Sequence, residues 1–173
     1  TTIKYSPSGS RLWIAKYNEP VEYDIDIATS LVTDIYGNVY VAGYSNGFGT
    51  MEDIAVVKYD LSGNEIWVER YNGAGNSYDI TTGIAIDQNF NIFVSGYTNS
   101  ASGSEDYLLL KIGADGNIIW NRTFDGTSAG YDITCGLVVD ASGNCTVSGY
   151  SFNTDSGEDY VTIKYDAGGA VVW

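Results

Sequence analysis

The chain has 173 residues, 44% of them apolar, and its 22 acidic and 8 basic residues give a formal net charge of −14. This composition predicts one globular domain with a sizeable core. The charge argues against nucleic acid and anionic membranes as partners, because both are bound through cationic groups. The chain contains no histidine, which weakens hypotheses of a histidine metal site or a serine–histidine catalytic pair.

No apolar run approaches the ~20 residues that a membrane-spanning helix needs, so we expect no membrane insertion. The sequence begins with Thr1 and not with methionine. We therefore expect the chain to be a processed or excised part of a longer protein.

The sequence repeats itself at intervals of 53 or 54 residues, as the spacing of Lys4, Lys58, Lys111 and Lys164 shows. The same spacing relates four tryptophans, Trp13, Trp67, Trp120 and Trp173. A repeat of this length is typical of solenoids and propellers.

Taken in chain order, residues 1–17 form a half unit, and complete units follow at residues 23–71, 78–124 and 131–173. A complete unit holds four strand-length apolar segments, which we call A, B, C and D; the half unit holds only C and D. In the second unit they span residues 79–87, 91–98, 106–112 and 117–124. Four-stranded antiparallel units repeated around an axis are the blades of a β-propeller. The sequence therefore predicts an all-β fold, a propeller segment of ~53-residue blades with three full blades and a half blade, and essentially no helix.

The short links within a unit carry turn residues. Segments A and B are joined by Asp-x-x-Gly-Asn at residues 34–38 and 140–144, and Phe90 replaces the glycine in the second unit. Aspartate starts such a turn and glycine supplies its positive φ, so we expect strain at Phe90. Segment A is rich in small residues around Ala28, Gly83 and Gly136, as a strand close to the propeller axis requires.

Three residue types recur or pair in ways that predict packing. The tryptophan of each segment D is expected between neighbouring blades. The recurring lysine is expected to lay its stem on apolar surface and to keep its head in water. If Cys145 lies opposite Val139, Cys135 is ~13 Å away along the ladder, too far for a disulfide. We expect both cysteines to be buried free thiols.

The chain cannot close a propeller alone, because both of its ends carry the same kind of segment. The termini are expected to meet copies of the chain or further blades of a longer chain, and segment C of the half unit offers an open edge for pairing.

The A–B segments at residues 26–45 and 132–151 resemble the seven-bladed β-propeller repeat family, SBBP, and every unit carries this likeness. The C–D segment at residues 58–67 is more weakly similar to pyrroloquinoline-quinone propeller repeats. The first resemblance implies a secreted or cell-surface protein of a prokaryote, from a family without a common catalytic motif. A shared fold does not supply a function.

The D–A and B–C loops are expected on one face of the disc, which would be strongly electronegative. Ligand-binding candidates there are the recurring aspartates and two loop phenylalanines, Asp26, Asp79, Asp132, Phe48 and Phe152. Metal-binding candidates are the acidic pairs at the start of each segment C, Glu52, Asp53, Glu105, Asp106, Glu158 and Asp159. Clustered carboxylates suit Ca²⁺. The alternative is that each aspartate binds backbone N–H groups of a neighbouring loop and recurs because the blade recurs.

The phenylalanines and exposed tyrosines would suit a glycan or a peptide, or else they pack between blades. Carboxylate pairs can run glycoside hydrolysis, but a ring of equivalent pairs argues for structure, and we expect no enzymatic activity. Asn121 and Asn144 lie in glycosylation sequons.

The sequence thus favours a non-enzymatic extracellular structural or adhesive module that self-associates through open blade edges. The alternative is a propeller that binds carbohydrate or Ca²⁺ through its acidic loop face.

Overall fold

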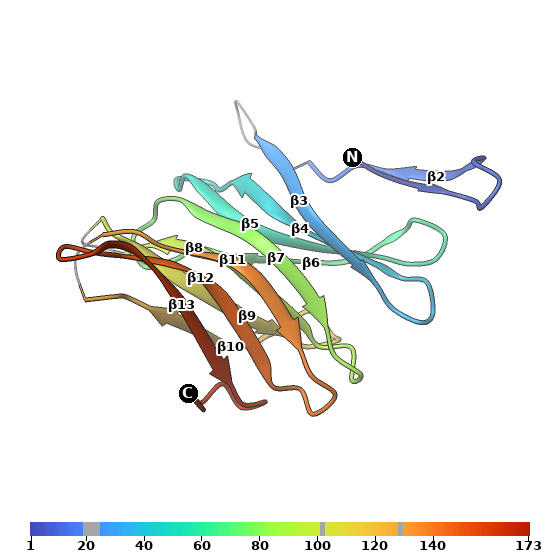
Figure 1. Ribbon diagram of the computed structural model, residues 1–173. Coiled ribbons are helices and arrows are strands. Elements are labelled where there is room, and N and C mark those ends of the chain that lie inside the picture. The colour runs from blue at the N-terminus through green and yellow to red at the C-terminus, as the bar shows by residue number, and fades with distance from the viewer. Residues whose placement is uncertain (19–24, 101–102, 128–129) are drawn as a thin grey trace.

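The computed structural model describes residues 1–18, 25–100, 103–127 and 130–173 (Figure 1). These residues form an all-β propeller segment without a helix, as the sequence predicts. Thirteen strands follow in chain order: β1 (Thr2–Tyr5), β2 (Arg11–Ala15), β3 (Asp26–Thr33), β4 (Val39–Asn46), β5 (Glu52–Tyr59), β6 (Glu65–Tyr71), β7 (Asp79–Ile86), β8 (Ile92–Asn99), β9 (Glu105–Ile112), β10 (Ile118–Phe124), β11 (Asp132–Val139), β12 (Cys145–Asn153) and β13 (Gly157–Tyr165). No helix in the described part of the chain is long and apolar enough to cross a bilayer.

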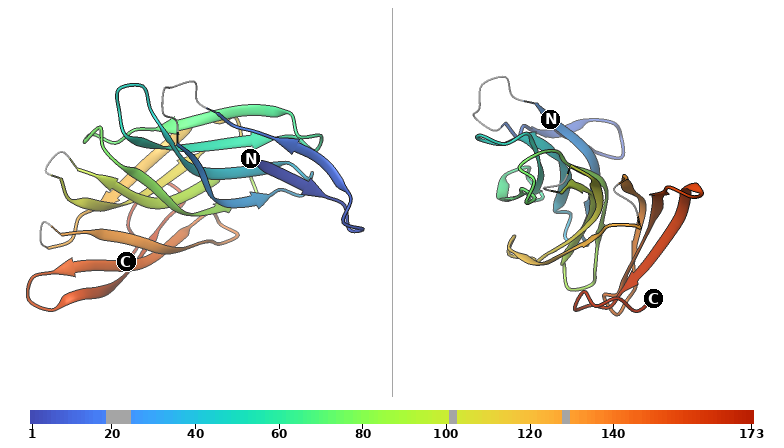
Figure 2. Two further views of the ribbon diagram at one scale, coloured as in Figure 1. Left: turned by 90° about the horizontal axis from the view of Figure 1, so that it is seen from above. Right: turned by 90° about the vertical axis from the view of Figure 1, so that its left-hand side faces the viewer.

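The strands form four antiparallel sheets in which each strand pairs with the next one in the chain. The first is the hairpin β1–β2, and two four-stranded sheets follow, β3 to β6 and β7 to β10. We call these the hairpin, the first sheet and the second sheet. The third sheet holds β11, β12 and β13. Successive sheets fan out beside one another, as Figure 2 shows.

The third sheet lacks the fourth strand that the sequence predicts. After the turn that follows β13, Val171 forms only an isolated bridge with Tyr165. Two backbone bonds continue this pairing, from Lys164 N to the carbonyl of Trp173 and from Val172 N to the carbonyl of Lys164. These contacts are too few to make a fourth strand of the third sheet in the structure.

The turns between the first two strands of each sheet follow the chemistry expected of Asp-x-x-Gly-Asn. The carboxylate of Asp34 accepts the backbone N–H groups of Tyr36 and Asn38, each at 2.9 Å. Gly37 takes the required positive φ, 81°. Phe90 takes φ 64° at the equivalent position, a region that a non-glycine residue enters only at a cost. Its ring lies 5.5 Å from that of Tyr36, so packing between the two turns offsets part of that cost.

The core lies between the sheets. One cluster joins Tyr40, Ile54 and Val56 of the first sheet to Val94 and Leu108 of the second. Another joins the second and third sheets, and a third packs the hairpin on the first sheet. The middle strands of the first and second sheets are therefore buried on both faces, which explains their nearly continuous apolar runs. The middle strand of the third sheet, β12, is buried only at alternate positions.

The first strands of the three larger sheets lie side by side, because their small residues allow close approach. The hydroxyl groups of Thr29 on β3 and Thr81 on β7 are hydrogen-bonded. Those of Thr82 and Thr134 on β11 repeat this bond at 2.7 Å. This is the inner position that the sequence assigns to segment A.

Three of the four tryptophans reach the last turn of the next sheet. The indole N–H of Trp13 donates to the carbonyl of Leu61, that of Trp67 to Ala114, and that of Trp120 to Ala167, at 3.0, 3.3 and 3.3 Å. Trp120 is buried, as expected, whereas Trp173 is 61% exposed because no further sheet covers it.

Two expectations about single side chains are wrong. Lys111 does not keep its head in water: it is 7% exposed, and its ammonium group donates to the carbonyl of Ala167 at 2.9 Å. Cys135 is exposed, because it lies at an irregularity of β11 and no further sheet packs on it. Cys145 is buried and lies opposite Val139 as predicted, and both thiols are free.

Candidate functional site

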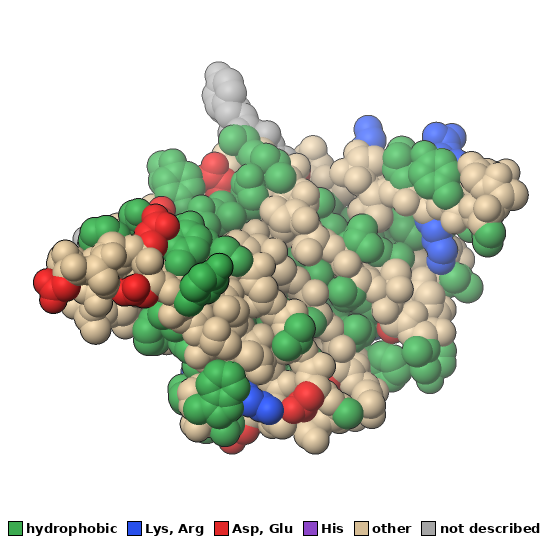
Figure 3. Space-filling model, in the orientation of Figure 1, with side chains coloured by type: hydrophobic (Ala, Val, Ile, Leu, Met, Phe, Trp, Pro, Cys, Tyr) green, Lys and Arg blue, Asp and Glu red, His purple; other side chains and the backbone are tan. Residues whose placement is uncertain are grey.

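The candidate site lies where the B–C and D–A loops meet, at the end of the sheets on the left of Figure 1. Several acidic side chains gather at that end in Figure 3, and the basic side chains of this view lie elsewhere. Asp26, Asp79 and Asp132 each begin the first strand of a sheet. The strand register places each of them in a row with a hydroxyl residue and a second aspartate, which are Ser45 and Asp53, Thr98 and Asp106, and Ser151 and Asp159.

Two of the three recurring aspartates, Asp79 and Asp132, anchor the loop that precedes their strand. Asp79 and Asp132 are each 1% exposed. One carboxylate oxygen of Asp79 accepts the backbone N–H of Gly73 at 2.6 Å, and one of Asp132 accepts that of Gly126 at 2.7 Å. Both glycines lie in the loop that enters the sheet. This supports the alternative in which the aspartate recurs because it anchors that loop.

The first sheet carries an ion pair at this end. Arg70 lies 3.2 Å from a carboxylate oxygen of Asp53. The guanidinium also donates to the hydroxyl and the carbonyl of Ser45, each at 2.9 Å, and to the hydroxyl of Tyr17 at 2.8 Å. Burial raises the pKa of the neighbouring Asp79, and the charge of Asp53 adds to the rise. The arginine thus compensates one of two buried carboxylates.

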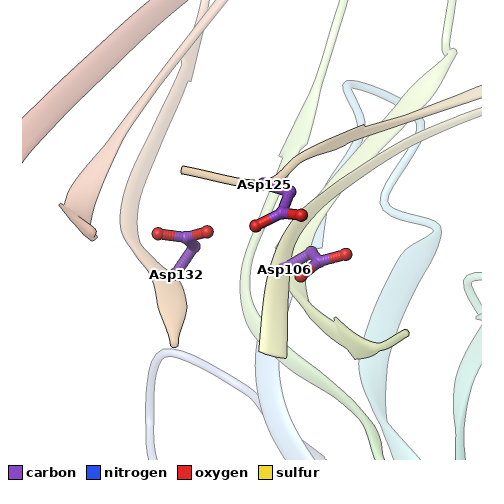
Figure 4. A group of neighbouring side chains, drawn as sticks. All are labelled: Asp106, Asp125 and Asp132. Atoms are coloured by element: carbon purple, nitrogen blue, oxygen red, sulfur yellow. The ribbon is translucent and has the colours of Figure 1, made fainter. Parts of the chain in front are cut away.

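The junction between the second and third sheets is different. One oxygen from each of Asp106, Asp125 and Asp132 lies within 4.8 Å of the others (Figure 4). Asp106 is the second residue of β9, Asp125 directly follows β10, and Asp132 begins β11. Burial raises the pKa of Asp106, and the charges of Asp125 and Asp132 raise it further, against a hydrogen bond from Ser104 that lowers it. The three carboxylates together can hold a cation.

The other predicted metal residues are not part of this group. Glu52 and Glu105 are half-buried at the outer ends of β5 and β9. Glu158 accepts a hydrogen bond from the hydroxyl of Tyr131 at 3.0 Å. Asp159 is exposed and accepts one from Ser156. Among the predicted pairs, only Asp106 joins a cluster of three acidic residues in the described part of the chain.

The two phenylalanines do not form one binding platform. Phe48 is 95% exposed in the loop before β5. Phe152 lies in β12 of the third sheet, and its ring is 5.6 Å from that of Tyr131. Phe48 could contact a glycan from the loop, whereas Phe152 packs within its own unit.

Asp125 was not among the residues that the sequence singled out. It lies in a column of the repeat with Asn18 and Asn72, at spacings of 54 and 53 residues. Thr123 lies in the column of Lys16 and Arg70 at the same spacings. Aligning the units reveals both differences: Asp125 replaces an asparagine, and Thr123 replaces a basic residue. Both make the same place in the unit more negative.

The sequence comparisons agree with a propeller repeat. Residues 21–49 and 66–103 match the sequence model of the SBBP beta-propeller repeat. An uncharacterized WD repeat-containing protein, L264, of Acanthamoeba polyphaga mimivirus is 24% identical over 179 residues, a match covering 74% of this chain and 13% of that protein. A crystal structure of a protein of unknown function from Bacteroides caccae matches with a TM-score of 0.36 and 13% identity, over 97% of this chain and 72% of that one.

The weaker similarity to pyrroloquinoline-quinone repeats is not confirmed. This chain covers only 13% of the mimivirus protein. The activity of that whole protein therefore cannot be transferred to this chain. Two stretches of this chain, residues 21–49 and 66–103, in contrast match the SBBP beta-propeller repeat by their own residues.

Proposed function

We propose that the chain is a non-enzymatic, extracellular structural or adhesive module whose end sheets pack against further propeller blades. These blades belong to copies of the chain or to a longer chain of the same repeats. The extracellular location is supported only by the likeness to SBBP repeats.

The observation that carries this proposal is the exposed face of the third sheet. Tyr160 on β13 is 94% exposed, whereas its equivalent in the second sheet, Tyr107, is 2% exposed. Trp173 and Trp120 show the same contrast, at 61% and 9%. Tyr107 and Trp120 are covered by the next blade. Their exposed equivalents in the third sheet, Tyr160 and Trp173, therefore present a surface that fits another blade. Burying them would remove a large apolar area from water.

The contacts between the sheets indicate that the partner is another blade of the same repeat. The indole N–H of Trp120 finds its acceptor in the turn after β13 of the third sheet. The acceptor of Trp67 lies one sheet earlier, and that of Trp13 two sheets earlier. A blade added to the third sheet would bring an equivalent turn to Trp173. The same repeat therefore supplies the complementary surface.

The test is the concentration dependence of molar mass, measured by sedimentation velocity or light scattering. We expect the chain to associate, and Tyr160→Lys to weaken association at least tenfold by placing a charge on the packing face. Phe48→Lys is the matched control, because Phe48 is equally exposed but lies on a loop. A monomer at all concentrations, or equal effects of the two substitutions, would contradict packing through this face.

A further inference from the structure

The two junctions between the larger sheets differ in charge although they occupy equivalent positions. The first junction has Asp53 and Asp79 with Arg70, and Asn72 follows its last strand. The second junction has Asp106 and Asp132, but Thr123 replaces the arginine and Asp125 replaces the asparagine. The same place in the fold therefore has two carboxylates and a guanidinium in one junction, and three carboxylates without that guanidinium in the other.

Burial makes this arrangement costly unless a cation is bound. Asp132 is 1% exposed, and only one of its carboxylate oxygens has a partner, the N–H of Gly126. Its Oδ1 atom is buried without a hydrogen bond. Figure 4 shows the carboxylate of Asp132 directed toward Asp125 and Asp106. A buried carboxylate without a compensating partner is unfavourable.

The first junction shows how the fold meets this cost elsewhere. Asp53 Oδ1 and Asp79 Oδ1 also lack hydrogen bonds, but the charge of Arg70 lies 3.2 Å from Asp53. Thr123 has a short neutral side chain and cannot supply that charge. The repeat therefore places no guanidinium beside Asp106 at the position equivalent to Arg70.

We propose that Asp106, Asp125 and Asp132 bind a hard divalent cation between the second and third sheets. The ligand atoms are all carboxylate oxygens, which suit Ca²⁺ or Mg²⁺ better than softer metals. Their mutual distances, within 4.8 Å, fit a shared ion, because oxygens at 2.3–2.6 Å from Ca²⁺ can be at most about 5 Å apart. Asp125 is exposed, so water can complete the coordination.

The site would fasten the loop that joins two blades. Asp106 and Asp125 belong to the second sheet and its outgoing loop, and Asp132 to the third sheet. A bound ion would hold both ends of this loop and the adjacent sheet together. This proposal does not depend on the structural or adhesive role proposed above.

The test is titration of the metal-free chain with CaCl₂ and, separately, MgCl₂, followed by isothermal calorimetry and by the melting temperature. We expect saturable binding of one ion per chain and a melting temperature that rises with its concentration. Asp125→Asn, which installs the residue found at position 72, should weaken the affinity at least tenfold. Asp125 is exposed, so this substitution should not disturb the fold.

Thr123→Arg is the sharper variant, because it rebuilds the first junction at the second. The new arginine should pair with Asp106, abolish ion binding and raise the melting temperature of the metal-free chain. Asp155→Asn is the matched control: it removes one exposed carboxylate from a loop of the third sheet and should leave the affinity unchanged.

Three results would overturn the site. They are the lack of saturable binding of either ion at millimolar concentration, binding that Asp125→Asn leaves intact, and equal losses in Asp125→Asn and Asp155→Asn. Ca²⁺-dependent slowing of amide exchange at Gly126, lost in Asp125→Asn, would place the ion at this junction independently of heat or melting.

Discussion

The contact between each tryptophan and the next sheet can be tested with Gly116→Ala. Gly116 has φ +95°, and a Cβ atom built there would lie 2.9 Å from two atoms of the Trp67 ring. Gly63 and Gly169 stand in the same relation to Trp13 and Trp120. The glycine therefore serves two needs at once, a left-handed backbone and close approach of an indole ring.

The expected cost follows from these two needs. A left-handed non-glycine residue costs about 1–2 kcal/mol, and overpacking adds about 1–3 kcal/mol. Alanine also reduces the conformational entropy of the unfolded chain, which offsets about 0.4–1 kcal/mol of this cost. We expect Gly116→Ala to lower the free energy of unfolding by about 2–4 kcal/mol, measured by urea titration.

Gly49→Ala is the matched control. Gly49 also has a positive φ, +81°, but nothing lies within 4 Å of its built Cβ atom, so only the backbone cost applies. Trp67→Leu removes the ring, and in that background Gly116→Ala should cost no more than Gly49→Ala. If Gly116→Ala costs the same as Gly49→Ala in the parent chain, the ring does not press on the turn and the reasoning is wrong.

Three further predictions follow from single contacts. Arg70→Met should lower the free energy of unfolding by about 3 kcal/mol, because it leaves the carboxylate of Asp53 buried without a counter-charge. In urea titrations, adding Asp53→Asn to this variant should recover part of the loss. Strictly additive effects of the two substitutions would contradict the pairing. A thiol reagent should titrate one cysteine in the native chain and two in denaturant, because Cys135 is exposed, whereas burial hides Cys145 and raises its pKa to about 11; two fast-reacting native thiols would contradict this. Burial raises the pKa of Asp79 above 3.8 and that of Glu69 above 4.5, so stability should rise as the pH falls from neutrality through these raised values. It should then fall below pH 3.8, as Asp60 and Asp115 lose the hydrogen bonds from Asn64 and Asn117 that lower their pKa values. Urea midpoints between pH 7 and 3 test this profile, and Asp79→Asn should flatten its rising part.

The repeat made the strands and turns predictable. In the second unit, the predicted and observed strand bounds differ by no more than one residue. This accuracy has a physical source, because each unit is bounded by turn residues such as Asp34 and Gly37 whose backbone preferences are local. Where the local preference fails, as at Phe90, the strain expected from the sequence appears as a positive φ.

Burial was less predictable, because it depends on which sheet covers a face. Tyr107 and Tyr160 have equivalent surroundings in sequence, yet one is buried and the other exposed. Cys135 was misjudged for the same reason. Lys111 was misjudged because its acceptor, the carbonyl of Ala167, lies 56 residues away in the next sheet. Contacts between blades are set by the neighbouring unit and do not show in the segment that makes them.

The candidate cation site illustrates where function is to be sought in a repeated sequence. Residues that recur in every unit, such as Asp79 and Asp132, carry the contacts that every blade needs, and Gly73 and Gly126 show what those contacts are. Recurrence alone therefore favours structure. A site needs something further at one junction, and Asp125 provides it, with the change at Thr123 acting in the same direction. One departure from the repeat would be ordinary variation. Two departures that both increase negative charge around a buried carboxylate would destabilise the fold unless a bound cation compensates them.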